Sequence, residues 1–325
     1  MSGFPRAVRR PRRDPKVVAL GGGHGLAATL SALRRVTPHL TAVVTVADNG
    51  GSSGRLRDEL HVLPPGDLRM ALAALCGDDE WGRTWADVLQ HRFSSGGALH
   101  DHAVGNLLIV ALWQLLGEHV EGLDLVGRLL GAHGRVLPMS AVPLDITASV
   151  GGLPGDPDAV RLVRGQVQVA STAGQVLSVA LEPADPPVCP EAAVAIGAAD
   201  VVVVGPGSWF TSVIPNLLVP GLLRALQETP ARRVVVLNLA PQPGETSGFS
   251  AETHLEVLGA HATEFTVDVV LADPSSVTDL ASLEESAASL GARLVIADVA
   301  VGDGTPRHDP LRLAAALEPI VRQRG

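Results

Sequence analysis

The stretch VVTVADNGGSSGRLR, residues 43–57, decides the fold class. Its first four residues are apolar or β-branched, which predicts a buried strand. The stretch then changes to glycines, serines and one acid, Asp48, followed by two arginines. Ligands of open α/β sheets bind outside the carboxyl ends of the strands. We therefore expect a loop here that binds a small molecule carrying a phosphate or a sugar.

A second glycine-rich stretch precedes it. Residues 16–20 predict a first strand and residues 26–36 a helix, and between them lies GGGHG, residues 21–25. Glycine lets a backbone approach a phosphate closely, and a helix N-terminus offers free N–H groups and a positive dipole end. This order is typical of a nucleotide-binding α/β fold. The alternative is a tight turn that binds nothing.

Residues 23–28 also fit the pattern G-x-G-x-x-A, and Asp48 stands where a dinucleotide fold places its ribose-binding acid. Two absences narrow the chemistry. Lys16 is the only lysine, which excludes a P-loop, and the chain has no tyrosine, which excludes a Tyr–Lys proton relay. A bound anion would therefore be met by arginine, by backbone amides or by a metal ion.

Charge separates the N-terminus from the rest of the chain. The 325 residues carry a net charge of −9, yet the first 16 residues carry +5. No apolar run follows this basic segment as it would in a secretory signal. We expect residues 1–15 to form a disordered tail and residues 16–325 a single α/β domain. We expect neither a specific nucleic-acid partner nor a membrane span.

The two cysteines, Cys76 and Cys189, match no metal or redox spacing, which indicates a reduced, cytoplasmic protein. Because symmetric dimers are common, we expect a homodimer.

Strand and helix patterns alternate along most of the chain, which predicts a mostly parallel sheet between two helical layers, a three-layer Rossmann-like architecture. Residues 136–183 differ, because short alternating runs at 136–139, 145–148, 165–169 and 176–180 predict a small antiparallel insertion. After it we expect strands at 200–204, 233–239, 267–271 and 294–297, and helices at 211–227, from 251, at 275–290 and from 310.

Several motifs together resemble one family, the YvcK-like gluconeogenesis factors, which share a fold with the CofD-like 2-phospho-L-lactate transferases. The motifs are GGGHG (21–25), VADNGGSSGRLR (46–57), PGDLR (65–69), HAVGNL (102–107), GPGS (205–208) with PNL (215–217), and QPGET (242–246). The resemblance covers nearly the whole chain from Lys16 onward. One departure is His24, which stands where the family usually has threonine.

The resemblance implies a protein that binds UDP-activated sugars such as UDP-N-acetylglucosamine. It also implies a regulatory role in cell shape and peptidoglycan synthesis during growth on gluconeogenic carbon sources, with a partner protein in cell-wall synthesis. The transferase relatives use magnesium, whereas the serine-rich loop at 48–54 is typical of the YvcK-like branch. Enzymatic turnover is therefore not the expectation, and no catalytic residue is assigned.

The candidate ligand-binding residues follow the loops. They are Gly21, Gly22, Gly23, His24, Gly25, Asp48, Asn49, Gly51, Ser52, Ser53, Arg55, Gly66, Asp67, His102, Asn106, Gly205, Gly207, Ser208, Asn238, Gln242, Glu245 and Thr246.

For several of these the residues leave two interpretations open. Asp48 either contacts a ribose or Mg²⁺, or braces its own loop as an Asx turn. Asp67 either faces the ligand or caps the helix at 68–75, and Ser208 either binds an anion or caps the helix from 211. On a helix, Arg55 and Arg57 would diverge, so only one, preferably Arg55, faces the ligand.

Three more residues near the loops carry polar chemistry. His102 and Asn106 are four residues apart and can face one cleft, whereas His100, Asp101 and His102 lack the spacing of a zinc site. Glu245 is the acid suited to a metal ion or to sugar hydroxyls.

Three functions remain open at this point. The first is a regulatory protein that binds a UDP-sugar, the second a Mg²⁺-dependent transferase acting on a phosphate ester, and the third an NAD-binding oxidoreductase.

Overall fold

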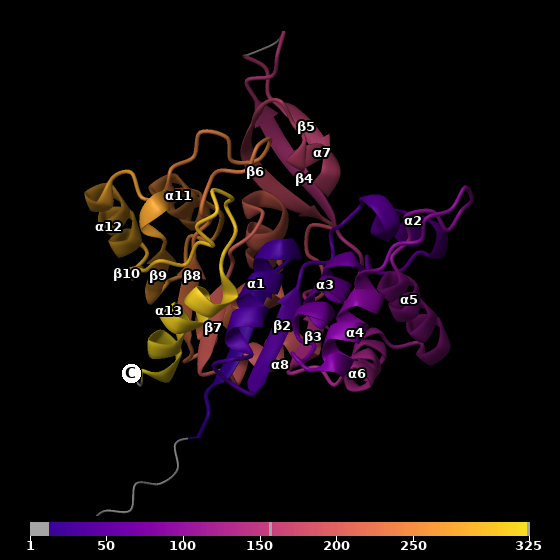
Figure 1. The fold of residues 1–325 in the computed structure, drawn as a ribbon. Coiled ribbons are helices and arrows are strands. Elements are labelled where there is room, and N and C mark those ends of the chain that lie inside the picture. Colours follow the sequence, from indigo (N-terminus) through magenta and orange to yellow (C-terminus); the bar gives the residue numbers. More distant parts are fainter. Residues whose placement is uncertain (1–12, 156–157, 324–325) are drawn as a thin grey trace, which may run out of the picture.

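Seven parallel strands form the central layer of the protein, which is described by a computed structural model at residues 13–155 and 158–323 (Figure 1). Their order across the sheet is β10-β9-β8-β7-β1-β2-β3, and every neighbouring pair is parallel. The strands are β1 (Lys16–Gly21), β2 (His39–Val44), β3 (Arg135–Pro138), β7 (Val201–Val204), β8 (Arg232–Val236), β9 (Val269–Ala272) and β10 (Arg293–Ile296).

The inner strands are apolar because both faces of the sheet are covered. The four valines of β7 are all buried, and so are Val17 to Leu20 in β1. Strands buried on both faces read as continuous apolar runs, because no side of the strand meets water. This is why the sheet was recognisable in the sequence.

Helices cover the two faces and confirm the predicted three-layer α/β architecture. α1, α3 and α13 lie in front of the sheet in Figure 1, and α8 lies behind it with α10 packed against it. The helices are α1 (Gly23–Leu33), α2 (Gly51–Leu60), α3 (Gly66–Ala74), α4 (Glu80–Gln90), α5 (Val104–Leu116), α6 (His119–Leu130), α7 (Gln166–Ala170), α8 (Pro190–Gly197), α9 (Ile214–Leu218), α10 (Pro220–Glu228), α11 (Ala251–His261), α12 (Leu280–Ser289) and α13 (Pro310–Arg322), with a π-helical turn η1 (Trp209–Val213) and a 3₁₀ turn η2 (Pro274–Ser276).

The chain reverses its direction of travel across the sheet between β1 and β7. From β1 it moves outward through β2 to β3, and from β7 it moves outward the other way to β10. At such a switch point the loops after the two central strands diverge and leave a crevice, where α/β proteins bind ligands. The fold therefore places residues 22–25 and 205–208 at the same crevice.

The antiparallel insertion exists, but its strands differ from the prediction. It is a three-stranded sheet in the order β5-β4-β6, with β4 (Asp145–Gly151), β5 (Arg161–Arg164) and β6 (Gln175–Glu182). Residues 136–139, predicted to belong to it, instead provide β3, which pairs with β2 in the main sheet.

Residues 165–169 were predicted as a strand and form the short helix α7 instead. Gly165, with φ of +99°, turns the chain out of β5. The side chain of Asn49 then accepts a hydrogen bond from the backbone N–H of Val167 (3.0 Å), which holds the start of α7 against the loop after β2. A short alternating pattern cannot reveal this capture by a distant side chain.

Two further boundaries were wrong. Residues 51–57, predicted as a loop, form most of α2, so only residues 45–50 connect it to β2. The helix predicted at 211–227 is broken into η1, α9 and α10. α9 and α10 meet at Val219–Pro220, and proline both lacks an N–H group and keeps the preceding residue out of the helical region.

Most of the predicted N-terminal tail lies outside the described residues. At its end, Pro15 accepts a hydrogen bond from Thr37, and Asp14 lies 3.6 Å from Arg322 of α13. Within the described part of the chain, no single helix is long and apolar enough to cross a membrane. One pair of shorter helical segments passes that test together, but it bends by 74°.

The anchor between Asn49 and α7 gives a first prediction. Replacing Asn49 with alanine removes its bonds to Val167 and to Gln168 (3.1 Å), and each such bond stabilises by about 1 kcal/mol. We expect amide hydrogens of α7 to exchange roughly tenfold faster, measured by hydrogen exchange with mass spectrometry. The matched control Gln168→Ala removes only one bond and should show a smaller increase. Unchanged exchange in both variants would contradict the anchor.

Candidate functional site

The first glycine loop is the N-terminus of α1. Gly22 is the residue before the helix, no side chain caps it, and the first turn contains no acidic residue. The backbone N–H groups at a helix start have no partners within the helix, and they favour an anion. Gly23, with φ of +57°, is in a conformation that suits glycine. The loop can therefore bind a phosphate through its backbone.

The second glycine loop touches the first. A side chain at Gly25 would place its Cβ atom 2.2 Å from the carbonyl oxygen of Pro206 and 2.7 Å from the Cα atom of Gly207. Gly205 and Gly207 have positive φ angles of +75° and +154°. The two loops can meet this closely only because Gly25 carries no side chain.

The loop after β8 holds the second glycine loop in place. The side chain of Asn238 accepts a hydrogen bond from Gly207 N–H (2.9 Å) and donates one to its carbonyl oxygen (2.8 Å). Gln242 donates to the hydroxyl of Ser208 (3.3 Å), and no side chain caps the helical turn η1. Asn238 and Gln242 thus position the loop, whether or not they also contact a ligand.

Two carboxylates lie at the first glycine loop. A Cβ atom at Gly22 would be 2.4 Å from an oxygen of Asp67, and one at Gly66 would be 3.0 Å from Asp48 and 2.3 Å from Ser53 Oγ. Asp48 also accepts a hydrogen bond from Gly50 N–H (2.8 Å), so it does form the Asx turn that the sequence allowed.

Asp67 is not the helix cap that the sequence also allowed. It lies inside the first turn of α3, where Pro65 is the cap residue. Burial, and then the neighbouring charge of Asp48, raise the pKa of Asp67 to about 7, although a hydrogen bond from the backbone of Gly23 opposes this. At neutral pH the site therefore contains a carboxyl group that is easily protonated beside a second carboxylate.

This pair fits Mg²⁺ only if the ligand completes the coordination. Among the described residues, no group of three or more histidine, cysteine, aspartate or glutamate side chains could hold a metal ion. Mg²⁺ is commonly bound by one or two carboxylates together with substrate phosphates and waters. Asp48 and Asp67 would supply the carboxylates, and the glycine loop would hold the phosphate next to them.

A buried polar network lies beyond the carboxylates. Ser52 contacts His102 Nδ1 and Asn106 Nδ2, each at 3.0 Å, and Arg69 Nε donates to Asn106 Oδ1 (2.9 Å). All four residues are buried. His102 and Asn106, predicted to face one cleft, both contact the side chain of Ser52, and a ligand cleft shared by the two stays a prediction.

Burial in this network shifts the pKa values of two of its side chains, Arg69 and His102, away from their ordinary values. Burial lowers the pKa of the Arg69 guanidinium to about 10, with a further effect from Arg92. Burial, and then Arg55, also lower the pKa of His102. The network braces α2, α3 and α5 against one another, and a direct ligand contact by Ser52 or Asn106 stays a prediction.

Of three further candidates, Arg55 and Asn49 form hydrogen bonds with other parts of the protein, and Gly51 has open space around it. Arg55 donates to the carbonyl oxygens of Ala98 and His100, and Arg57 bonds to Asp145, so the two arginines diverge as predicted. Asn49 is engaged with α7, as described above. Gly51, at the start of α2, has nothing within 4 Å of the place of a side chain.

Glu245 is committed inside the protein. Its carboxylate accepts hydrogen bonds from the Thr211 hydroxyl (2.6 Å) and from Phe210 N–H (3.3 Å), and burial raises its pKa. Thr246 accepts a bond from the backbone of Gln242 (2.8 Å). A contact between Glu245 and a sugar or metal ion would first require these bonds to break, so the geometry assigns it to the support of η1.

A pocket of about 340 Å³ opens at the switch point and collects five of the predicted residues. They are His24, Gly25, Gly207, Asn238 and Gln242. The same pocket is lined by Pro306, Arg307 and His308, which sequence reasoning missed. These three follow β10 in the stretch VGDGTPRHDP, residues 301–310, which is one more glycine-containing loop between a strand and a helix. The position of this loop, after a strand and before a helix, is the sequence signal that could have identified these three residues.

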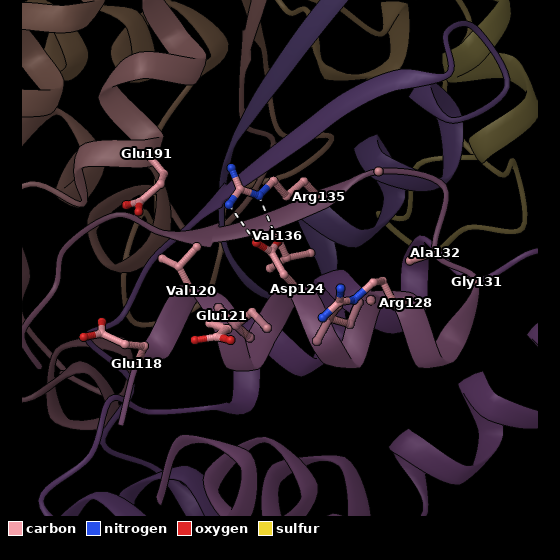
Figure 2. Close-up of a pocket in the computed structure, with 14 residues that line it drawn as sticks. Glu118, Val120, Glu121, Asp124, Arg128, Gly131, Ala132, Arg135, Val136 and Glu191 are labelled. Atoms are coloured by element: carbon pink, nitrogen blue, oxygen red, sulfur yellow. Dashed lines mark hydrogen bonds and ion pairs between the residues drawn. The ribbon is translucent and has the colours of Figure 1, made fainter. Parts of the chain in front are cut away.

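A larger pocket, of about 750 Å³, lies elsewhere (Figure 2). It lies between α6, the start of β3 and α8. Its residues 131–134 directly precede β3, so the pocket lies at the amino-terminal ends of the strands, whereas the glycine loops lie at the carboxyl ends. Glu118, Glu121 and Glu191 line it, and Arg135 there pairs with Asp124 at 2.7 Å. Its carboxylates would repel a phosphate, so size does not identify the ligand site here.

A family model described as 2-phospho-L-lactate transferase CofD matches residues 17–302. A Bacillus subtilis protein named gluconeogenesis factor is 35% identical over 267 residues, which cover 82% of this chain and 81% of that protein. A Mycobacterium tuberculosis protein that carries the same name provisionally is 58% identical over 307 residues, 94% of this chain and 90% of its own.

The chain belongs to the gluconeogenesis factor branch of the CofD family. A crystal structure of a UPF0052 family member from Bacillus halodurans has the same fold, with a TM-score of 0.83 and 33% identity. The match covers 94% of this chain and 99% of that one. These comparisons confirm the family predicted from the motifs.

The contact between the glycine loops gives a second prediction. In Gly25→Ala the new Cβ atom meets backbone atoms that cannot rotate away, so we expect a loss of about 3 kcal/mol in the free energy of unfolding, measured by urea denaturation. The control Gly97→Ala adds the same group at an exposed position with open space around it. It should stay within about 0.5 kcal/mol of wild type.

The carboxylate pair gives a third prediction. The pKa of Asp67 is higher in the folded protein than in the unfolded chain, so its effect disfavours folding increasingly as the pH rises from about 4 to 7. The free energy of unfolding of Asp67→Asn, relative to that of wild type, should therefore be about 2 kcal/mol higher at pH 8 than at pH 5. Urea denaturation at both pH values measures it. Asp78→Asn is the control, because Arg34 lowers the pKa of Asp78, and it should show no such gain.

Proposed function

We propose that the protein binds a UDP-activated sugar, such as UDP-N-acetylglucosamine, at the switch point between β1 and β7. The observation that carries this proposal is the meeting of two glycine loops at one pocket, beside the N-terminus of α1, where Gly22 supplies no side-chain cap. The loops offer backbone N–H groups to a diphosphate, and Arg307 in the same pocket offers a guanidinium. The family membership supports the same role.

The proposal describes a regulatory protein rather than an enzyme. Ser52 and His102 form the hydrogen-bonded pair that most resembles a nucleophile and its base, but both are buried, and the Ser52 hydroxyl also accepts hydrogen bonds from Asn106 and from the backbone N–H of Ala103. We propose that the liganded protein acts in the cytoplasm, as a homodimer, on a partner protein in cell-wall synthesis, and that this links cell shape to growth on gluconeogenic carbon sources.

A second candidate is a Mg²⁺-dependent transferase that acts on a phosphate ester. It is favoured by one observation, the pair Asp48 and Asp67 beside the glycine loop. Mg²⁺ held there would neutralise charge on a phosphate. The two candidates differ in turnover, which the transferase requires and the regulatory protein lacks. The NAD-binding oxidoreductase has less support, because the chain offers no Tyr–Lys relay.

Calorimetric titration tests the proposal. We expect saturable binding of UDP-N-acetylglucosamine and none of NAD, and we expect Mg²⁺ to strengthen binding because it relieves the repulsion between the diphosphate and the two carboxylates. Arg307→Gln should weaken binding at least tenfold, since it removes a charged partner. Arg224→Gln, at an exposed position of α10 outside the lining of this pocket, is the matched control.

The outcomes separate the candidates. Binding without product formation supports the regulatory protein. Cleavage of the UDP-sugar by the pure protein, lost in Asp48→Ala, would favour the transferase. Binding of NAD alone would overturn both in favour of the oxidoreductase.

A further inference from the structure

Apolar residues make up part of the lining of the pocket at the switch point. Besides the glycine loops, its lining includes Leu239, Ala240, Pro241, Pro243 and Pro306. Ligand pockets commonly combine apolar walls of this kind with a few polar groups that fix orientation. Rigid apolar walls suit a flat ring better than a polyhydroxylated sugar, whose hydroxyl groups would each lose a partner on binding. The walls thus favour the nucleobase of a nucleotide as the occupant.

Two polar atoms in the wall of this pocket have no partner. They are Nε2 of His308 and Oε1 of Gln242, and both are closed to solvent. Burying a polar atom without a hydrogen bond is energetically unfavourable, so such atoms are uncommon and mark places where a partner is missing. Their joint presence in one pocket wall indicates a ligand that supplies the partners.

The environment of His308 defines which kind of partner it needs. Burial lowers its pKa to about 4, although a hydrogen bond to the backbone of Leu237 opposes this. The imidazole is therefore neutral, so one ring nitrogen carries a lone pair, and Nε2 accepts a hydrogen bond in the tautomer that has its proton on Nδ1. The amide of Gln242 can turn either its oxygen or its nitrogen to the pocket.

We infer that His308 is the residue that recognises the base of the ligand, by accepting a hydrogen bond from a ring N–H group at Nε2. Gln242 lies in the same pocket and pairs with the atom next to that N–H. In this arrangement the base lies between the prolines, and the diphosphate extends to the N-terminus of α1. The inference rests on the proposed nucleotide-binding function and adds a specificity-determining residue to it.

The base reaches His308 through a movement of residues 301–307. Gly302 and Gly304, with φ of +84° and +83°, lie at turns of this strap, which is largely exposed. Asp303 and Thr305 bind Arg307, so the side-chain bonds of the strap are largely internal to it. It can therefore shift as a unit, with Arg307 moving together with Asp303 and Thr305, and expose Nε2 of His308.

The test compares UDP with its 3-methyl analogue, in which a methyl group replaces the N3–H of uracil. For the wild-type protein we expect at least tenfold weaker binding of the analogue by calorimetry, because sites built around a hydrogen bond reject ligands that lack it. His308→Phe removes the acceptor and keeps a ring, so it should bind UDP at least tenfold more weakly and no longer distinguish the two ligands.

Two further variants keep the test sharp if the phenylalanine variant fails to fold. His308→Gln restores an acceptor and should recover part of the discrimination. Arg307→Gln should weaken both ligands by the same factor and leave their ratio unchanged, because a guanidinium contacts the phosphates and not the base.

The two proposals fail in different ways. Equal binding of UDP and 3-methyl-UDP by the wild-type protein would overturn base recognition by His308 and leave nucleotide binding intact. Loss of discrimination in Arg307→Gln as strong as in His308→Phe would likewise overturn it. Binding of neither UDP nor UDP-N-acetylglucosamine would overturn both proposals.

Discussion

The contact between Gly25 and the Pro206–Gly207 backbone is the constraint on which the site depends. A Cβ atom at Gly25 would lie 2.2 Å from a carbonyl oxygen that belongs to another loop. The absence of a side chain therefore decides how close the loops after β1 and β7 can come. Their closeness brings the start of α1 next to the residues held by Asn238 and closes one side of the pocket.

The start of α1 combines a positive helix end with two neighbouring carboxyl groups, Asp48 and Asp67. The start of α1 favours an anion, yet Asp48 and Asp67 already place carboxylates beside it, and Asp67 holds its proton to about pH 7. A diphosphate entering here meets both attraction and repulsion. A proton on Asp67, or a divalent cation bound by the two carboxylates, reduces this repulsion. Binding of the proposed diphosphate ligand would therefore depend on pH and on divalent cations, which fits the proposed regulatory role better than a permanent cofactor site.

The supports of the site come from far away in the sequence. Glu245 holds η1 through Thr211, and Asn49 holds α7, so two side chains that looked like ligand contacts in the sequence brace neighbouring elements. Arg307 and His308, which were not predicted, line the pocket. The motifs identify loops correctly, but whether a polar residue in a loop faces the ligand or the protein depends on partners more than 30 residues away.

The sequence by itself determined the α/β class, the central strands and the family, because buried parallel strands read as apolar runs and glycine turns follow them directly. It also placed residues 21–25 and 205–208 at strand ends. Only the tertiary structure decided that β1 and β7 are neighbours, that residues 136–138 join the main sheet and that residues 166–170 form a helix. These outcomes depend on strand pairing and on contacts between side chains that are far apart in the sequence, and a local sequence pattern contains no information about either.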